Sequence, residues 1–68
     1  MNAVIEAIAA KALHQFRISA TEYQTLNRLL NENTNLGDRD ITLGRRVIYG
    51  VRHGIVHLDV EGGHWWLL

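Results

Sequence analysis

The stretch TLGRRVIYGVRH, residues 42–53, decides which of two folds this chain adopts. Its apolar residues recur at four-residue spacing, which is the period of one buried face of an α-helix. That face would comprise Leu43, Val47, Ile48 and Val51. Either Asp40 or Thr42 would cap such a helix at its start, because both side chains accept hydrogen bonds from free backbone amides.

The same stretch also has features of a β-strand. Residues 47–49 are β-branched or aromatic, and Gly44 and Gly50 each weaken a helix by about 1 kcal/mol. A strand over residues 45–51 would join two later strands in a three-stranded antiparallel meander against which two helices pack. Because the apolar period fits 3.6 residues better than 2, the sequence favours the helix, with the meander as the alternative.

The N-terminal half predicts two helices, the first over residues 2–16. Its apolar stripe is Val4, Ile5, Ile8, Ala9, Ala12, Leu13 and Phe16. The second helix begins at a capping box, in which Ser19 accepts from the amide of Glu22 while the Glu22 carboxylate accepts from the amide of Ser19. This helix ends among the asparagines before Gly37. Its buried stripe is expected to be Tyr23, Leu26, Leu29 and Leu30.

The C-terminal segment predicts a β-hairpin. Residues 55–60 alternate in polarity, residues 61–63 contain two glycines, and residues 64–68 form an apolar return strand. The core side of the first strand would carry Val56, Leu58 and Val60. The expected fold is therefore α+β, a single domain over residues 1–68 in which two or three N-terminal helices precede the hairpin.

Length and composition narrow the functional classes. A chain of 68 residues buries little surface and this one has no cysteine, so self-association is the expected source of added stability. No apolar run reaches the length of a membrane span and no positive leader precedes the first helix, so we expect a cytoplasmic protein without a membrane partner. Seven basic residues balance seven acidic ones, which argues against a strongly basic nucleic-acid binder.

Catalysis and metal binding find little support. The serine and threonine residues are not arranged with a histidine in a nucleophile motif, and no glycine-rich phosphate loop is present, so we expect neither an enzyme nor a cofactor. His53, His57 and His64 could ligate zinc or nickel together with Asp59 or Glu61. However, the hairpin register places His57 and His64 on opposite faces, so no metal site is expected.

Positive charge is concentrated in the stretch that decides the fold. If residues 42–53 form a helix, its exposed face would carry Thr42, Arg45, Arg46, Tyr49 and Arg52, with His53 at its end. Guanidinium groups bind guanine edges and phosphates through paired hydrogen bonds, and threonine and tyrosine add further contacts. These five residues of the helix are the candidate surface for duplex DNA.

The order of three helices and a hairpin, with the basic helix third, resembles a winged helix-turn-helix protein. The resemblance rests on element order and charge placement over most of the chain. It implies a small, dimeric transcriptional regulator whose third helix enters the major groove of DNA. Two features depart from that pattern: the connection over residues 33–41 is long, and the hairpin carries acidic Asp59 and Glu61 where a wing would carry lysine or arginine.

A protein interface is the competing interpretation. Adjacent strand residues point to opposite faces, so one hairpin cannot bury both Trp65 and Trp66 in one core. Trp65, Leu67 and Leu68 would then lie beside an unpaired strand edge, which favours pairing with a second copy or another protein. In this alternative the chain is a non-enzymatic interaction module, of the small phage or plasmid inhibitor or adaptor type, that binds its partner through the hairpin.

Overall fold

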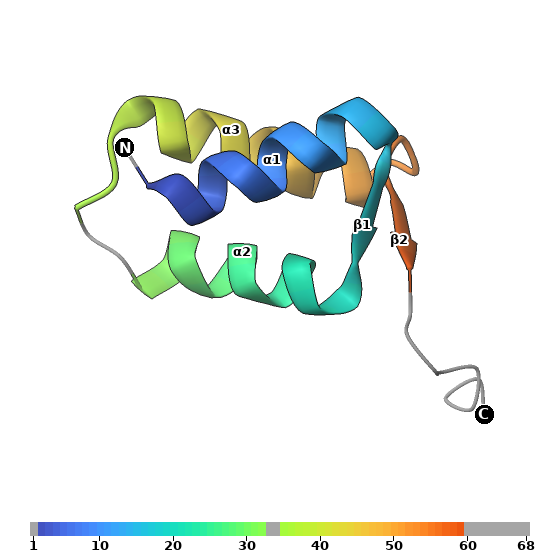
Figure 1. Ribbon diagram of the computed structural model, residues 1–68, viewed down its shortest axis with the longest axis horizontal. Helices are drawn as coiled ribbons and strands as arrows, with labels where there is room; N and C mark the ends of the chain where they lie inside the picture. Colours follow the sequence, from blue (N-terminus) through green and yellow to red (C-terminus); the bar gives the residue numbers. More distant parts are fainter. Residues whose placement is uncertain (1, 33–34, 60–68) are drawn as a thin grey trace.

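The computed structural model describes residues 2–32 and 35–59 of the chain, and these form three helices and two short strands (Figure 1). In chain order the elements are α1 (Ala3–Gln15), β1 (Arg17–Ser19), α2 (Ala20–Glu32), α3 (Asp38–Arg52) and β2 (His57–Asp59). The predicted α+β class is therefore confirmed. None of the helices in the described ranges is long and apolar enough to cross a membrane.

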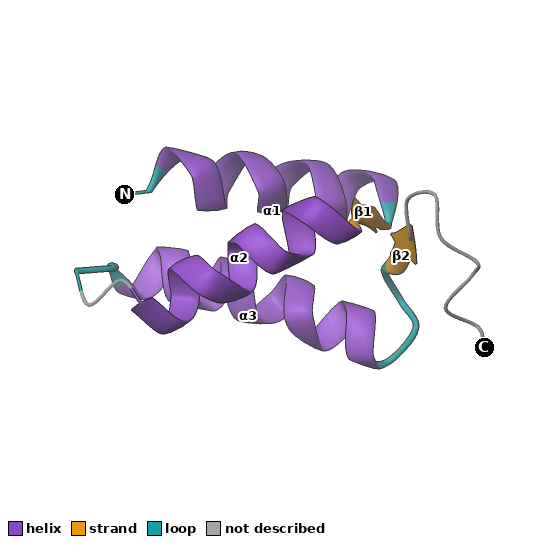
Figure 2. Ribbon diagram, turned by 90° about the horizontal axis from the view of Figure 1, so that it is seen from below, coloured by secondary structure: helices purple, strands orange, loops and turns teal. Residues whose placement is uncertain are grey.

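The helices form a small bundle with the strands at one end. α1 and α3 run in the same direction and α2 runs back, while β1 and β2 lie side by side where α1 ends (Figure 1, Figure 2). α1 packs against both other helices, and α2 also packs against α3. The core residues are all at most 2% exposed, and they are Ile5, Ala9, Ala12, Ile18, Leu26, Val47 and Val56.

α1 has a distinct signal at each end. The Asn2 side chain accepts hydrogen bonds from two first-turn amides, at 2.9 and 3.0 Å, and so satisfies donors that a helix start leaves unpaired. At the other end Phe16 adopts a left-handed backbone with φ of 57° and donates its amide to the Ala12 carbonyl. The helix expected over residues 2–16 is thus confirmed, with its two outermost predicted residues acting as caps.

α2 begins at the predicted capping box. Ser19 Oγ accepts from the Glu22 amide at 3.0 Å, and Glu22 Oε1 accepts from the Ser19 amide at 3.1 Å. These reciprocal bonds satisfy two backbone donors at the helix start, as the sequence predicts. The predicted stripe also faces the core, through Tyr23, Leu26, Leu29 and Leu30.

The decisive stretch is helical, so the helical prediction is confirmed and the three-stranded meander is wrong. The helix starts earlier than expected, at Asp38, with Gly37 as N-cap and no side chain in the capping role. Neither Asp40 nor Thr42 caps it, because both lie inside its first two turns. The predicted buried face does pack on the core, through Leu43, Val47, Ile48 and Val51.

The sheet is parallel and joins segments that are distant in the sequence. Its register places Arg17–Ser19 alongside His57–Asp59, residue for residue. The sequence patterns do not predict β1, because three residues are too few to show an alternation of polarity. The prediction of an antiparallel hairpin is therefore wrong. In the described part of the chain, β2 pairs with β1, and the two strands are parallel.

The side chains around β2 nevertheless follow the predicted alternation. Val56 is buried and Leu58 packs against the core, whereas Ile55 and His57 are exposed. The turn and the return strand predicted for the hairpin fall on residues 60–68, which lie outside the described residues.

Candidate nucleic-acid interface

The candidate DNA surface lies on α3, whose other side is anchored in the core. All five predicted residues are exposed. Four of them share one face because they follow at helical spacings: Thr42, Arg45, Tyr49 and Arg52. Arg46 is exposed beside that face, while Gly44, Val47 and Gly50 are buried behind it. The structure thus brings the five predicted residues together on the outside of one helix.

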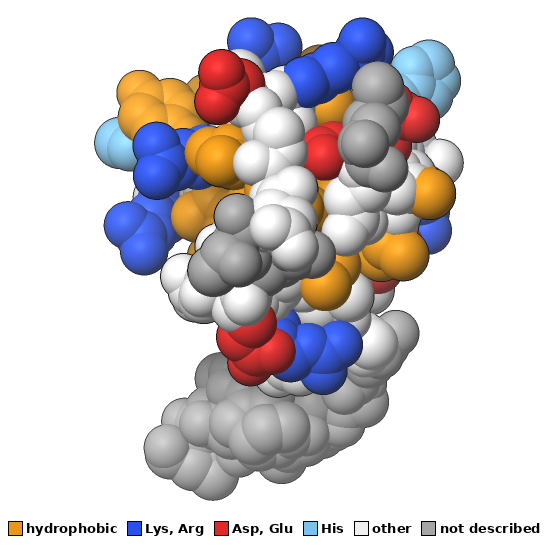
Figure 3. All heavy atoms as spheres, turned by 90° about the vertical axis from the view of Figure 1, so that its left-hand side faces the viewer, with side chains coloured by type: hydrophobic (Ala, Val, Ile, Leu, Met, Phe, Trp, Pro, Cys, Tyr) orange, Lys and Arg blue, Asp and Glu red, His pale blue; other side chains and the backbone are white. Residues whose placement is uncertain are grey.

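The arginines of this surface have no acidic partner in residues 2–32 and 35–59. Over those ranges, lysine and arginine ion pairs join Lys11 to Glu22 at 3.2 Å and Arg17 to Asp59 at 2.6 Å, and neither pair involves α3. Seen from the end of the bundle at which α1 begins, basic side chains gather along the upper and left-hand edges of the molecule (Figure 3). Among the described residues, no ion pair therefore neutralises Arg45, Arg46 or Arg52, although the whole chain has no net charge.

Tyr49 stacks on His53, one helical turn further along the chain. Their ring centroids lie 4.1 Å apart, and the ring planes are tilted by 34°. Tyr49 is 59% exposed, so the pair lies on the surface. Exposed aromatic rings next to guanidinium groups provide stacking surface for the unpaired bases of single-stranded nucleic acid.

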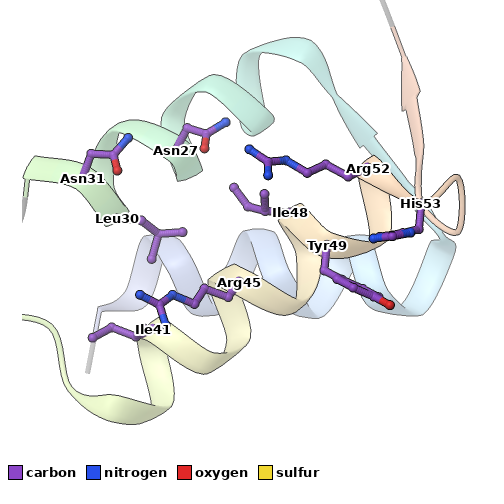
Figure 4. A pocket seen from close by; sticks show the side chains of 9 residues that line it. All are labelled: Asn27, Leu30, Asn31, Ile41, Arg45, Ile48, Tyr49, Arg52 and His53. Carbon is purple, nitrogen blue, oxygen red and sulfur yellow. The ribbon is translucent and has the colours of Figure 1, made fainter.

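A groove of about 380 Å³ lies between α2 and α3 (Figure 4). Three predicted site residues, Arg45, Tyr49 and Arg52, line it together with His53. Thr42 and Arg46 are not among the lining residues. The five predicted residues therefore divide into three that border this groove and two that lie on the helix outside it.

The sequence patterns do not reveal the contribution of α2 to this groove. Asn27 and Asn31 line it, and their four-residue spacing is visible in the sequence. However, the apolar stripe of α2 does not indicate which polar residues face α3, because that depends on how the two helices pack. Side-chain amides both donate and accept hydrogen bonds, so the two asparagines suit phosphate, carboxylate or base ligands.

No group of three metal-ligating side chains occurs among the described residues, which include His53 and His57 but not the third histidine of the set considered from the sequence. His57 Nε2 lies 3.4 Å from Asp59 Oδ1. Asp59 is already bound by Arg17 through two hydrogen bonds of 2.6 and 3.1 Å, and the hydrogen bond from this guanidinium lowers the pKa of the carboxyl group below its ordinary value. His64 and the predicted interface residues Trp65, Leu67 and Leu68 lie outside the described residues.

No family model, curated protein or solved structure matches this chain. The geometry and charge of α3 and of the α2–α3 groove are therefore the basis for a functional assignment.

Proposed function

We propose that this chain is a small DNA-binding regulator that places the exposed face of α3 against duplex DNA. The observation that carries the proposal is that three exposed arginines of α3, Arg45, Arg46 and Arg52, have no ion-pair partner in the described part of the chain. Unpaired guanidinium groups on a helix are suited to phosphates and to guanine edges, which they bind with two parallel hydrogen bonds.

The shape of this surface supports duplex DNA as the target. An α-helix fits the major groove of DNA, and helices that read sequence do so with a few outward side chains on one face. Thr42, Arg45, Tyr49 and Arg52 provide such a face, with a hydroxyl, two guanidinium groups and an aromatic ring. Arg46, beside the face, is placed to bind the phosphate backbone.

The order of elements supports a winged helix-like arrangement. The helix pair α2 and α3 precedes β2, as in that arrangement, whereas the parallel pairing of β1 with β2 is not the antiparallel hairpin of a wing. Only residues 33–37 separate the two helices, so the connection is shorter than the stretch of residues 33–41 expected from the sequence. A wing would have to be formed by residues 60–68, which lie outside the described residues.

Fluorescence anisotropy of a labelled duplex tests the proposal. The protein should bind duplex DNA. If Arg45, Arg46 and Arg52 each neutralise one phosphate, raising the salt concentration from about 50 to 200 mM should weaken binding about 40-fold. The variant Arg45→Ala/Arg46→Ala/Arg52→Ala should lose this binding and its salt dependence while retaining its helical circular dichroism spectrum.

A charge-matched control separates a local site from a general effect of charge. The variant Lys11→Gln/Arg17→Gln/Arg28→Gln removes the same number of positive charges from exposed positions outside α3. It should retain most of the affinity for duplex DNA. If the wild-type protein fails to bind duplex DNA at low salt, or if both triple variants lose affinity equally, the proposal is wrong.

Self-association is a further part of this proposal. DNA-binding proteins of this size commonly bind two half-sites as symmetric dimers. The predicted contact through Trp65, Leu67 and Leu68 stays a prediction, because these residues lie outside the described part of the chain. Sedimentation velocity of the wild type and of the Trp65→Ala variant tests this contact. If both proteins sediment as dimers, Trp65 does not form the dimer contact.

A further inference from the structure

The groove between α2 and α3 has an apolar floor and a polar rim. Leu30, Ile41 and Ile48 provide its apolar lining, and all three are partly buried. Arg52 extends from α3 across Ile48, and Arg45 extends along α3 to lie beside Ile41 (Figure 4). A volume of about 380 Å³ falls within the range of pockets that take small organic ligands.

The charge of the lining is unbalanced. Arg45, Arg52 and His53 line the groove, and none of the aspartates and glutamates in residues 2–32 and 35–59 lines it. Positively charged side chains on one wall of a groove give it a positive potential, which attracts anions. Asn27 and Asn31 add amide donors on the opposite wall. The lining is therefore complementary to a negatively charged ligand with an apolar body.

The spacing of the two arginines narrows the class of ligand. Residues seven apart on a helix are separated by two turns, or about 10 Å along the axis. Ile48 lies between them and contributes the apolar surface that a ligand would cover. A flat apolar body with an acidic group at each end matches this order of cation, apolar surface and cation.

We propose that the α2–α3 groove is a binding site for a small, flat organic anion, best of all an aromatic dicarboxylate. The ligand body lies on Leu30, Ile41 and Ile48, and its acidic groups bind Arg45 and Arg52. Binding to the groove does not depend on the proposed DNA function. One consequence does rest on that function: because Arg45 and Arg52 belong to both surfaces, the ligand competes with DNA and acts as an effector.

Isothermal titration calorimetry with a charge series on one ring tests the site. The probes are naphthalene-2,6-dicarboxylate, naphthalene-2-carboxylate and the neutral naphthalene-2,6-dicarboxamide. Each charged contact to an arginine is expected to strengthen binding by about tenfold or more, so affinity should fall in that order. If the neutral diamide binds as tightly as the dicarboxylate, or if none of the three binds, the proposal is overturned.

Matched variants locate the binding. Arg45→Ala/Arg52→Ala should weaken the dicarboxylate by at least about tenfold, because both acidic groups lose their partners. Arg28→Ala/Arg39→Ala removes two exposed arginines that do not line the groove, and it should bind the dicarboxylate as the wild type does. Equal loss in both variants would show a general charge effect and would overturn the site.

Competition separates this inference from the proposed function. If the dicarboxylate binds the wild-type protein while duplex DNA does not, the ligand site in the groove is supported and the proposed DNA-binding function is wrong. If duplex DNA binds and the dicarboxylate does not, the proposed ligand site is wrong and the DNA-binding function is supported. If both bind, the dicarboxylate should displace labelled duplex from the wild-type protein, and simultaneous binding would overturn the effector role.

Discussion

The Asp40 carboxylate accepts a hydrogen bond from the backbone amide of Asn2, with 2.8 Å between Oδ2 and the nitrogen. This contact joins the first turn of α3 to the residue that caps α1. Asp40 is only 1% exposed, and its other carboxylate oxygen has no hydrogen-bond partner among the described residues. Through this hydrogen bond the buried Asp40 side chain connects the N-terminal ends of the two helices.

Removing this carboxylate should destabilise the bundle. Asp40→Ala is expected to lower the free energy of unfolding by about 1.5–3 kcal/mol, because the Asn2 amide loses a charged acceptor. Asp40→Asn should cost less, since its amide oxygen still accepts the same hydrogen bond. Urea denaturation at neutral pH measures both, and an Asp40→Ala variant as stable as the wild type would show that the contact contributes nothing.

The capping box makes a separate contribution at the start of α2. Ser19→Ala should lower the free energy of unfolding by about 1 kcal/mol, because the Glu22 amide loses the hydroxyl that accepts from it. In a domain of this size, such a loss corresponds to several degrees of melting temperature. Thermal unfolding followed by circular dichroism gives the answer. An unchanged melting temperature would mean that the serine hydroxyl is dispensable for helix initiation.

The Glu22 carboxylate should make stability depend on pH. The hydrogen bond from the Ser19 backbone, with a smaller contribution from Lys11, lowers the pKa of Glu22 in the folded protein. Its stabilising effect is therefore present above the ordinary carboxyl range of about pH 4–5 and is lost as the pH falls through the lowered value. Melting temperatures of wild type and Glu22→Gln should differ more at neutral pH than at about pH 3. A difference that does not change with pH would contradict this role.

The two buried glycines of α3 should respond differently to alanine. A Cβ on Gly50 would lie 2.8 Å from Val56 Cγ2, and Val56 is fixed by a 2.9 Å hydrogen bond from its amide to the Gly50 carbonyl. A Cβ on Gly44 would lie 2.8 Å from both Cδ atoms of Leu30 and 3.1 Å from its Cγ, so the Leu30 side chain would have to turn away, toward the groove that it lines. Gly50→Ala should therefore cost about 1–2 kcal/mol, since overpacking exceeds the gain in helix propensity, whereas Gly44→Ala should stay within about 1 kcal/mol of the wild type. Urea midpoints decide it, and the reverse order would contradict the packing described.

Local signals in the sequence account for most of the helical part of the fold. The capping box at Ser19 and the apolar periods of all three helices depend on contacts within a few residues, so they can be read directly from the chain. The start of α3 is less predictable, because Asp40 has the side chain of an N-cap but is used instead for a tertiary contact with Asn2. A helix boundary set by tertiary contact has no local signature.

The sheet and the groove depend on contacts that the sequence does not display. β1 is three residues long and pairs with a strand far along the chain, so its pairing can be recognised only once the helices are placed. The exposed face of α3 follows from its apolar period, and the residues predicted there are exposed. Asn27 and Asn31 of α2 border the same groove as Arg45 because of the way the two helices pack. No pattern within α2 specifies this packing.

Backbone amide chemical shifts, recorded while unlabelled duplex DNA is added at low salt, test the central proposal most directly. The measurement reports binding and its location together and requires no substitution. The proposed function predicts that the largest changes fall on residues 42–53, with smaller changes on the neighbouring face of α2 and little change at β1. Absence of changes in residues 42–53 at saturating DNA, or changes concentrated on another surface, would contradict the assignment of α3 as the DNA-binding helix.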